Sequence, residues 1–224
     1  MPPTLTTTLA HTVSDQITSL HLISDSIAQQ RQTTSLALLQ HPQTLTLLSL
    51  TLLLISKLLY KTPQDAPLLL TTYTGTITTL LLAIRYLTRR YLDEAERVGT
   101  WRWLYEPEVD IEPTQPEDLI LISKFDEKII GTLVLRPVHG TTSTSRHVSE
   151  KDRADLTDGV PVAVIRAWTV RLGYRGCGVG RGLLEGAVVV GRERGWQGPV
   201  FSKKNAHSLR LGGWACGILE GIRG

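Results

Sequence analysis

The sequence predicts an α/β fold, layered in the α+β manner around a mixed central sheet, with an N-terminal helical transmembrane hairpin before it. Three observations predict this class. Residues 1–84 are rich in Leu and Thr and almost uncharged, whereas most Arg, Asp and Glu follow them. Two long apolar runs stand close together in the uncharged part. The later part alternates β-branched runs, a glycine-rich turn and a helical pattern, which is the order of a layered sheet domain.

Composition limits the partners that the chain is expected to have. The 224 residues carry a formal net charge of +3 and no stretch concentrates Lys and Arg, so we expect no nucleic-acid partner. The two cysteines, Cys177 and Cys216, are too few for a disulfide framework, which favours a reduced, cytosol-facing location. Neither cysteine has the spacing of a zinc ligand, so we expect no metal.

The N-terminal segment, residues 1–40, is predicted to be polar with one amphipathic helix. It has no basic region followed directly by an apolar stretch, so a cleaved signal peptide is not expected. Residues 1 to about 14 are interpreted as a polar tail. A helix is then expected with Ser14 or Asp15 as its N-cap, because apolar residues recur every three or four positions, at Ile17, Leu20, Ile23 and Ile27.

Residues 41–90 are predicted to form the hydrophobic hairpin. The runs Thr44–Tyr60 and Pro67–Leu87 are separated only by KTPQDA. The second run is about 21 residues, or roughly 31 Å as a helix, which matches the hydrocarbon core of a bilayer. Threonine is tolerated there because its hydroxyl can bond a carbonyl one turn back. A buried helical hairpin in a soluble protein is the alternative, and the membrane hairpin is favoured.

The charges around the hairpin predict its orientation. The short turn keeps both flanks on one side of the membrane. Arg85, Arg89 and Arg90 follow the second helix, against Lys57 and Lys61 at the turn. The excess of positive charge on the flanks predicts that they, and everything downstream, face the cytoplasm.

Residues 91–224 are predicted to form the soluble domain. Trp101, Trp103 and Tyr105 are interpreted as core of this domain in preference to interfacial anchors. Residues 107–118, with three prolines among acidic residues, are expected to be a linker or loop. Two strands, Leu119–Phe125 and Ile129–Arg136, follow with a tight turn between them.

The rest of the domain contains a strand, a turn and a helix in that order. His139 and His147 lie in a polar connection, and no ligand role is expected for them. The β-branched run of residues 160–172 predicts a central strand, and residues 182–195 have the apolar spacing of a helix. A further short strand and a helix start at Asn205 are expected after it.

The glycine-rich stretch GYRGCGVGRGLLEG, residues 173–186, lies between that strand and that helix. Such a turn directs free backbone amides and the helix dipole toward an anion. A Walker loop is excluded because the stretch has no Lys, and the GxGxxG fingerprint is excluded because Leu183 and Arg181 stand where Gly is required. The spacing that fits is [RQ]xxGx[GA], from Arg175 to Gly180.

In this strand–loop–helix frame the chain resembles the GNAT superfamily of acetyl-CoA-dependent N-acetyltransferases. The resemblance covers about residues 100–210 for the fold. The hydrophobic double segment before the domain resembles, in architecture only, the camello-type branch, whose members are membrane-bound enzymes of the endoplasmic reticulum. The resemblance therefore implies a GNAT-like fold, an endoplasmic-reticulum membrane location and acetyl-CoA as co-substrate.

The resemblance also implies which residues bind the cofactor. Arg175 begins the motif, and the splayed end of the preceding strand would pair its main chain with the pantetheine arm, through Trp168, Thr169 and Val170. Asn205 fits the first position of the family pattern after the fifth strand. The CoA pyrophosphate would be held by the backbone amides of Gly176, Cys177, Gly178, Val179, Gly180 and Arg181.

The catalytic base and acid are left unassigned. In the family pattern, the position of the proton-donating Tyr falls on Gly212, and the closing aromatic comes early, at Trp214. The residues after Trp214 are too few for two closing strands, so we expect an incomplete C-terminal part. His207 is a candidate base, although a generic surface histidine is favoured. Cys177 is not expected to be a nucleophile, because the loop presents amides to the ligand.

The sequence is compatible with two functions. The first is a membrane-anchored N-acetyltransferase that acts on the amine of a protein or of a small molecule. The second is a non-catalytic GNAT-like membrane interaction or assembly protein with a membrane-protein partner. The intact loop favours the first, and the missing Tyr favours the second.

Overall fold

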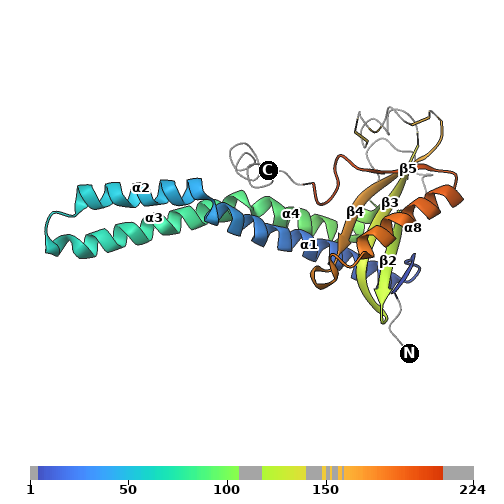
Figure 1. Ribbon diagram of the computed structural model, residues 1–224, viewed down its shortest axis with the longest axis horizontal. Helices are drawn as coiled ribbons and strands as arrows, with labels where there is room; N and C mark the ends of the chain where they lie inside the picture. The colour runs from blue at the N-terminus through green and yellow to red at the C-terminus, as the bar shows by residue number, and fades with distance from the viewer. Residues whose placement is uncertain are drawn as a thin grey trace. The chain divides into compact units, whose positions relative to one another are not determined.

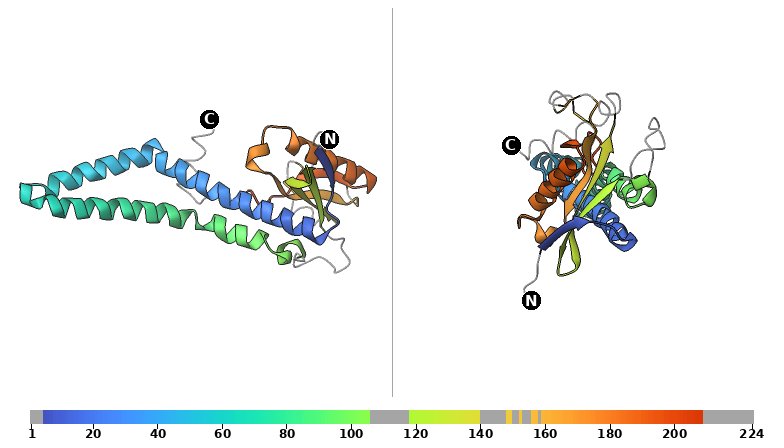
Figure 2. Two further views of the ribbon diagram at one scale, coloured as in Figure 1. Left: turned by 90° about the horizontal axis from the view of Figure 1, so that it is seen from below. Right: turned by 90° about the vertical axis from the view of Figure 1, so that its right-hand side faces the viewer.

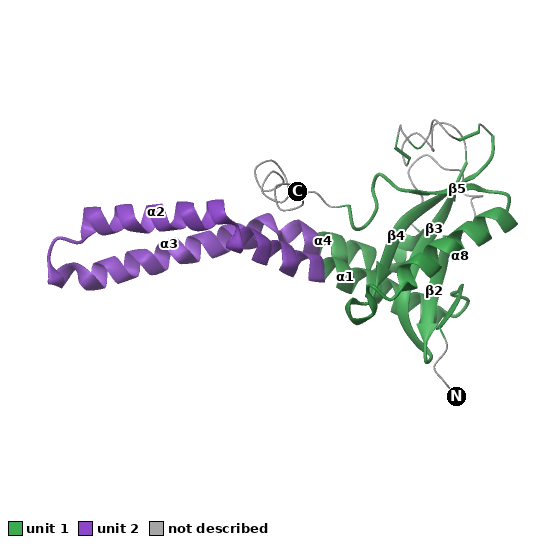
Figure 3. Ribbon diagram, viewed as in Figure 1, with its two compact units in different colours: residues 1–28, 93–209 green, residues 29–92, 210–224 purple. Residues whose placement is uncertain are grey.

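The computed structural model describes residues 5–105, 118–139, 148–149, 152, 156–157 and 159–208. The chain divides into two compact units, one of residues 1–28 and 93–209 and the other of residues 29–92 and 210–224 (Figure 3). The first unit contains the sheet, and the second contains the two apolar helices.

The sheet has five strands in the order β1-β2-β3-β4-β5 (Figure 1). Neighbouring strands pair antiparallel except β4 and β5, which are parallel and are joined through helix α8 (Val179–Glu193). The mixed sheet is therefore confirmed, as are the two predicted strands and the turn at Asp126 and Glu127. The strands are β1 (Leu5–Leu9), β2 (Leu119–Phe125), β3 (Lys128–Val138), β4 (Val162–Val170) and β5 (Gln197–Phe201).

Strand β1 corrects the prediction of a polar N-terminal tail. It pairs with β2 from Leu5 opposite Phe125 to Leu9 opposite Leu121, and Thr7 Oγ1 lies 2.9 Å from Ser123 Oγ. Four of its five residues are exposed. Backbone pairing and the β propensity of Thr suffice for an edge strand, so no hydrophobic alternation marks it in the sequence.

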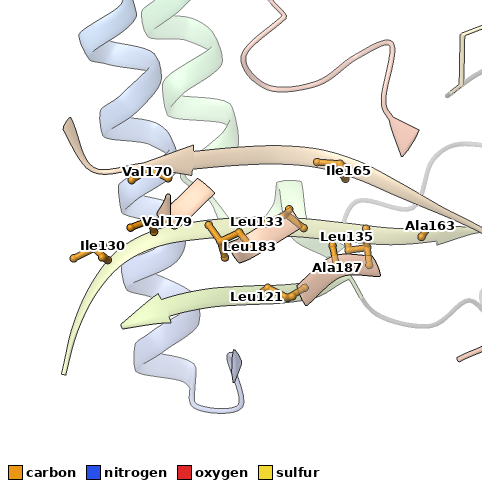
Figure 4. Packing of buried hydrophobic residues seen from close by; sticks show 10 residues of the cluster. All are labelled: Leu121, Ile130, Leu133, Leu135, Ala163, Ile165, Val170, Val179, Leu183 and Ala187. Atoms are coloured by element: carbon orange, nitrogen blue, oxygen red, sulfur yellow. The ribbon is translucent and has the colours of Figure 1, made fainter. Parts of the chain in front are cut away.

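Helix α8 covers one face of the sheet (Figure 2). Its apolar spacing was predicted, and Leu183 and Ala187 are fully buried. They pack against leucines and isoleucines that alternate along β2, β3 and β4 (Figure 4). The cluster comprises Leu121, Ile130, Leu133, Leu135, Ala163, Ile165, Val170, Val179, Leu183 and Ala187. This packing fixes the start of α8 near the end of β4.

The first part of helix α1 (Val13–Gln40) lies on the opposite face (Figure 2). The helix was predicted, but its cap is Thr12, whose Oγ1 accepts from the Asp15 amide at 3.1 Å, in place of Ser14 or Asp15. Of the four apolar residues that were expected to share one face of this helix, the first, Ile17, is 38 % exposed and the other three are buried. The three buried residues are Leu20, Ile23 and Ile27.

Two short helices complete this face, α4 (Arg89–Val98) and α5 (Trp101–Tyr105). Trp103 is buried, which confirms it as core, whereas Tyr105 is exposed and stacks on the half-buried Trp101 with ring centroids 5.8 Å apart. Ser24 Oγ on α1 donates to the Ala95 carbonyl on α4 at 2.9 Å. The aromatic segment therefore belongs to the sheet unit through Trp103.

The second unit contains the predicted hairpin. Helix α2 (Pro42–Leu59) and helix α3 (Ala66–Leu87) are joined through the 3₁₀ helix η1 (Pro63–Asp65). Ser56 Oγ and Tyr73 Oη lie 2.8 Å apart across the pair. As predicted, threonine hydroxyls bond carbonyls four residues back, including Thr51 to Leu47 and Thr74 to Leu70 at 2.8 and 2.9 Å.

The apolar side chains of this hairpin are largely uncovered. Among its described residues, only Thr44 of α2 and Ile84 of α3 are buried, while Leu53 is 66 % and Leu70 67 % exposed. By length and composition, Pro42–Leu59 and a stretch within Pro63–Val98 are each able to cross a membrane. Core helices of soluble proteins meet the same two criteria, so length and composition alone do not establish a membrane span.

Candidate functional site

The end of strand β4 separates from β5. The register pairs Val134 with Ala167 and Leu135 with Ile165, so Arg166 is an extra residue on β4, a β-bulge. A bulge bends its strand and interrupts pairing. The last parallel pair is Ile165 with Phe201, and beyond it the Ala206 amide donates to the Arg166 carbonyl at 2.9 Å. Residues 167–170 of β4 therefore have β3 on one side only.

On the other side of this segment, the main-chain groups of Trp168 and the amide of Val170 have no backbone partner among the described residues, whereas the Val170 carbonyl accepts from Arg175 Nε. The Arg171 amide donates to the Ile130 carbonyl on β3 at 2.7 Å. Because antiparallel strands alternate the direction of their backbone groups, Thr169 also faces β3, whereas Trp168 and Val170 face the open side. A segment of extended chain laid along this edge would pair with Trp168 and Val170 as an added strand does.

The glycine-rich loop lies between β4 and α8. Gly178 is the N-cap of α8 with φ +82°, Gly176 has φ +81°, and an added Cβ at either position would meet nothing within 4 Å. Both residues use the left-handed conformation that glycine adopts without strain. Among the described residues, none of the backbone amides from Gly176 to Arg181 donates to a carbonyl. Six consecutive free amides at a helix N-terminus form an anion-binding loop.

Two further glycines hold the loop close to the sheet. A Cβ on Gly180 would lie 2.9 Å from Cζ2 of Trp168, and one on Gly131 would lie 2.9 Å from Cδ1 of Leu183. Trp168 in turn packs its ring against Phe201, with centroids 5.9 Å apart. The start of α8 therefore sits directly against the residue that carries the open edge of β4.

The two arginines of the motif make different contacts. Arg175 Nε donates to the Val170 carbonyl at 2.9 Å, which fastens the loop to the end of β4. Arg181 is exposed and pairs with Glu185 one turn along α8, with Nε 2.8 Å from Oε1. Cys177 is an exposed free thiol. Arg175 therefore shapes the site, and Arg181 lies at its outer surface.

The favoured interpretation of His207 as a generic surface residue is wrong, because the side chain is half-buried and bonded to α1. Ser26 Oγ donates to the Ile23 carbonyl at 3.0 Å and lies 2.5 Å from Nε2 of His207. Because the Ser26 hydroxyl hydrogen is donated to that carbonyl, Nε2 of His207 carries the ring hydrogen and donates to Ser26 Oγ. Nδ1 then carries the lone pair, and it is buried without a partner among the described residues. Burial, and then the positive charge of Arg175, lower the pKa of His207 to about 4.

Asn205 connects the segment after β5 to this arrangement. Its Oδ1 accepts from the His207 amide at 2.9 Å, and its Nδ2 donates to the Ile165 carbonyl at 3.4 Å. Residues 203–204 and 206–207 form turns, so no helix starts at Asn205 within the described residues. His139 is exposed in the connection after β3. His147, Gly212, Trp214 and Cys216 lie outside the described residues.

A charged cluster that local sequence patterns did not indicate supports the bulge. The carboxylate of Asp118 is buried and pairs with Arg166 and with Arg136, whose Nη2 lies 3.0 Å from Oδ2. Arg166 also stacks over the ring of Trp103, 4.2 Å from the centroid, and donates to its carbonyl. The cluster holds the bulged residue on the face of the sheet opposite α8.

The fold and site define a class, an α/β domain that offers an anion-binding loop beside an unpaired strand edge. Residues 83–211 match the acetyltransferase (GNAT) family, and the chain belongs to this family. Family membership supports an acyltransferase that uses acetyl-CoA and acts on an amine acceptor. No curated protein matches the chain.

Solved acetyltransferase structures are similar at low identity. A ribosomal-protein-alanine N-acetyltransferase from Brucella melitensis biovar Abortus 2308 is 16 % identical with a TM-score of 0.30, over 49 % of this chain and 64 % of that one. An aminoglycoside acetyltransferase from an uncultured soil metagenomic sample, in complex with sisomicin, is 15 % identical with a TM-score of 0.31, over 55 % and 72 %. The chain spans less than two thirds of the Brucella structure, and family membership rests on the sequence match alone.

Proposed function

We propose that the protein is a membrane-anchored N-acetyltransferase that transfers the acetyl group of acetyl-CoA to an amine. The observation that carries the proposal is the meeting of the free amides from Gly176 to Arg181 with the unpaired edge of β4. Acetyl-CoA, when bound, supplies the thioester whose acetyl group passes to the amine nitrogen. The acceptor is the amine of a protein or of a small molecule.

The loop fits the pyrophosphate of this co-substrate. A side chain at Gly176 or Gly178 would fill the space in front of the amides, where nothing lies within 4 Å of an added Cβ. The N-terminal dipole of α8 adds to the attraction for phosphate. Arg175 keeps the loop against β4 by its bond to Val170, whereas Arg181 is paired with Glu185 at the outer surface of α8.

The open edge of β4 fits an extended amide chain such as pantetheine. The main-chain groups of Trp168 and the amide of Val170 bind it, and Thr169, turned to β3, only supports the strand. A backbone amide at this edge would stabilise the negative charge that develops on the thioester oxygen when the amine attacks. Trp168 Nε1, a buried donor without a partner among the described residues, lies on the side chain that packs against Gly180 and Phe201 and not on the open edge itself.

His207 acts as a positioning residue in this scheme. With a pKa of about 4 it is neutral at physiological pH, and a base this weak accepts a proton poorly from an ammonium group. Its bond to Ser26 ties the segment after β5 to α1, and Asn205, which accepts from the His207 amide, bonds the Ile165 carbonyl of β4.

We also propose that residues 41–90 form a membrane hairpin and that residues 91–224, together with β1 and the start of α1, form the acetyl-CoA-binding domain. The uncovered leucines of α2 and α3 and the internally bonded threonine hydroxyls support a lipid environment. The architecture resembles the camello-type branch, which supports the endoplasmic-reticulum membrane. The arginines after α3 support a cytoplasmic position for the domain.

The test is a titration of the detergent-solubilised full chain with acetyl-CoA, followed by thiol release against a panel of amines. Gly178→Ala places a side chain where φ is +82°, and Gly173→Ala is its matched control, since neither added Cβ meets an atom within 4 Å and only Gly178 is left-handed. A left-handed alanine costs about 1–2 kcal/mol, and a free loop that leaves this conformation must recover it when it binds the pyrophosphate. Affinity should therefore fall about fivefold to thirtyfold for Gly178→Ala only.

The possible results separate the two functions. Thiol release that depends on an amine supports the enzyme. Binding without release on any amine favours the non-catalytic interaction protein. No binding by the unaltered chain, or equal affinity of Gly178→Ala and Gly173→Ala, refutes the placement of the pyrophosphate in this loop.

A further inference from the structure

The second unit contains a cavity that acetyl transfer does not use. Its volume is about 510 Å³, and it lies beside α1, the end of α3 and the start of α4. Three of its lining residues are arginines and the others are apolar or aromatic. The lining residues are Arg31, Leu82, Arg85, Tyr86, Arg89 and Leu92.

Helix geometry explains why these side chains share one wall. Leu82, Arg85, Tyr86 and Arg89 are spaced by three, four and seven residues, which places them on one face of consecutive helical turns. The junction between α3 and α4 is held to α1 by Ser35 Oγ, which donates to Thr88 Oγ1 at 3.3 Å. The cavity is therefore part of the packed unit.

Two of the three arginines that line the cavity have no carboxylate partner among the described residues. Arg31 Nε is buried and has no hydrogen-bond partner among the described residues. Neither Arg31 nor Arg85 forms an ion pair with a described residue, whereas Arg89 also interacts elsewhere. A buried guanidinium N–H without an acceptor is costly, so an anion that reaches Arg31 would be bound favourably.

Apolar surface continues directly from these cations. Leu82 is 59 % and Tyr86 76 % exposed at the end of the apolar run of α3, and Leu92 closes the cavity wall. A phosphate beside arginines, with apolar side chains one turn away, is the arrangement that suits a lipid headgroup and its acyl chain. A free phosphate would use the arginines and leave the apolar wall unoccupied.

We propose that this cavity binds an anionic phospholipid, with its phosphate on Arg31 and Arg85 and an acyl chain along Leu82 and Leu92. The inference rests on the membrane hairpin of the proposed function and is independent of acetyl transfer. Bound lipid would hold the end of α3 at the headgroup level of the bilayer. The site selects for headgroup charge, because zwitterionic headgroups offer the arginines no net negative charge.

Native mass spectrometry of the detergent-solubilised full chain tests this proposal, with phosphatidylglycerol and phosphatidylcholine of identical acyl chains. Phosphatidylglycerol should be retained about twenty-five-fold more strongly, because each of the two arginines contributes about 1 kcal/mol. Arg85→Gln, at an exposed position, should lower its retention about fivefold, and Arg31→Gln with Arg85→Gln should bring it to the level of phosphatidylcholine. Arg90→Gln is the matched control, an exposed arginine outside the cavity, and should leave retention unchanged.

Three outcomes would overturn the proposal. Equal retention of the two lipids removes the role of the arginines. Full competition by glycerol 3-phosphate would show a site for small soluble anions and not for a lipid. An equal loss in Arg85→Gln and Arg90→Gln would show a diffuse surface charge. Flotation with pure phosphatidylcholine vesicles tests the hairpin separately. A chain that retains phosphatidylglycerol but does not float would refute the membrane anchor and the role of the lipid at the headgroup level, and would leave the arginine site itself.

Discussion

Two glycines in the first turn of α8 give the sharpest test of how the loop is held against the sheet. Gly180 and Gly182 are both helical, and alanine is favoured over glycine in a helix by about 0.5–1 kcal/mol. At Gly182 the added Cβ would meet only Thr7 Oγ1, at 4.0 Å. We therefore expect Gly182→Ala to stabilise the protein by up to about 1 kcal/mol.

At Gly180 the same methyl group would collide with a rigid neighbour. The added Cβ would lie 2.9 Å from Cζ2 of Trp168, whereas carbon atoms prefer about 3.5–4.0 Å. The indole ring cannot retreat freely, because it packs against Phe201. Overpacking of this kind costs about 1–3 kcal/mol, which offsets or exceeds the helical gain. Gly180→Ala should therefore be less stable than Gly182→Ala by about 1–3 kcal/mol.

Thermal unfolding of the two variants in the same detergent measures this difference. For a unit of this size, about 1–3 kcal/mol corresponds to roughly 3–10 °C between the two midpoints. Because Trp168 carries the open edge of β4, Gly180→Ala should also weaken acetyl-CoA binding, and Gly182→Ala should not. A Gly180→Ala variant as stable as Gly182→Ala, with unchanged affinity, would refute the close contact between α8 and β4.

Two further changes test the groups behind the site. The pKa of His207 lies below its ordinary value of 6.5, so its contribution to stability is present above pH 6.5 and is lost as the pH falls toward 4. Between pH 7 and pH 4 the unaltered chain should lose about 3 kcal/mol more than His207→Gln in urea unfolding, and parallel pH profiles would contradict this. Asp118→Asn should destabilise by about 3 kcal/mol, because two arginines lose their buried carboxylate. Asp126→Asn, in the exposed turn after β2, is the control for denaturant unfolding and should change stability by less than about 0.5 kcal/mol. Equal effects of Asp118→Asn and Asp126→Asn would refute the structural role of the cluster.

The sequence predicted those parts of the fold that local patterns specify. Strands β2, β3 and β4 are β-branched runs buried in the sheet, and the spacing of Leu183 and Ala187 marks the buried face of α8. The loop was found by its glycines, and Gly178 proves to occupy the left-handed conformation that requires one. Each of these signals lies within about ten residues, so one stretch of chain carries it.

What the sequence did not predict depends on contacts between distant residues. Strand β1 is a threonine-rich edge strand, whose stabilising partner, β2, lies more than 100 residues away. The bond between Ser26 and His207 spans 181 residues, and the pair of Arg166 and Asp118 spans 48. The residues around Ser26, His207, Asp118 and Arg166 give no local signal of either contact. Only the fold brings the loop, His207 and α1 into one place.

The bulge at Arg166 resolves a conflict in what β4 must do. A strand in the middle of a sheet normally pairs on both sides, yet a strand that binds an extended ligand must leave one side open. The extra residue lets β4 remain paired with β3 along its whole length while it turns away from β5 after Ile165. The side chain of Arg166 then needs a partner on the buried face, and Asp118 supplies it. The buried charges therefore stabilise the bend that opens the site, and a hydrophobic residue at Arg166 would be expected to keep the core but lose the open edge.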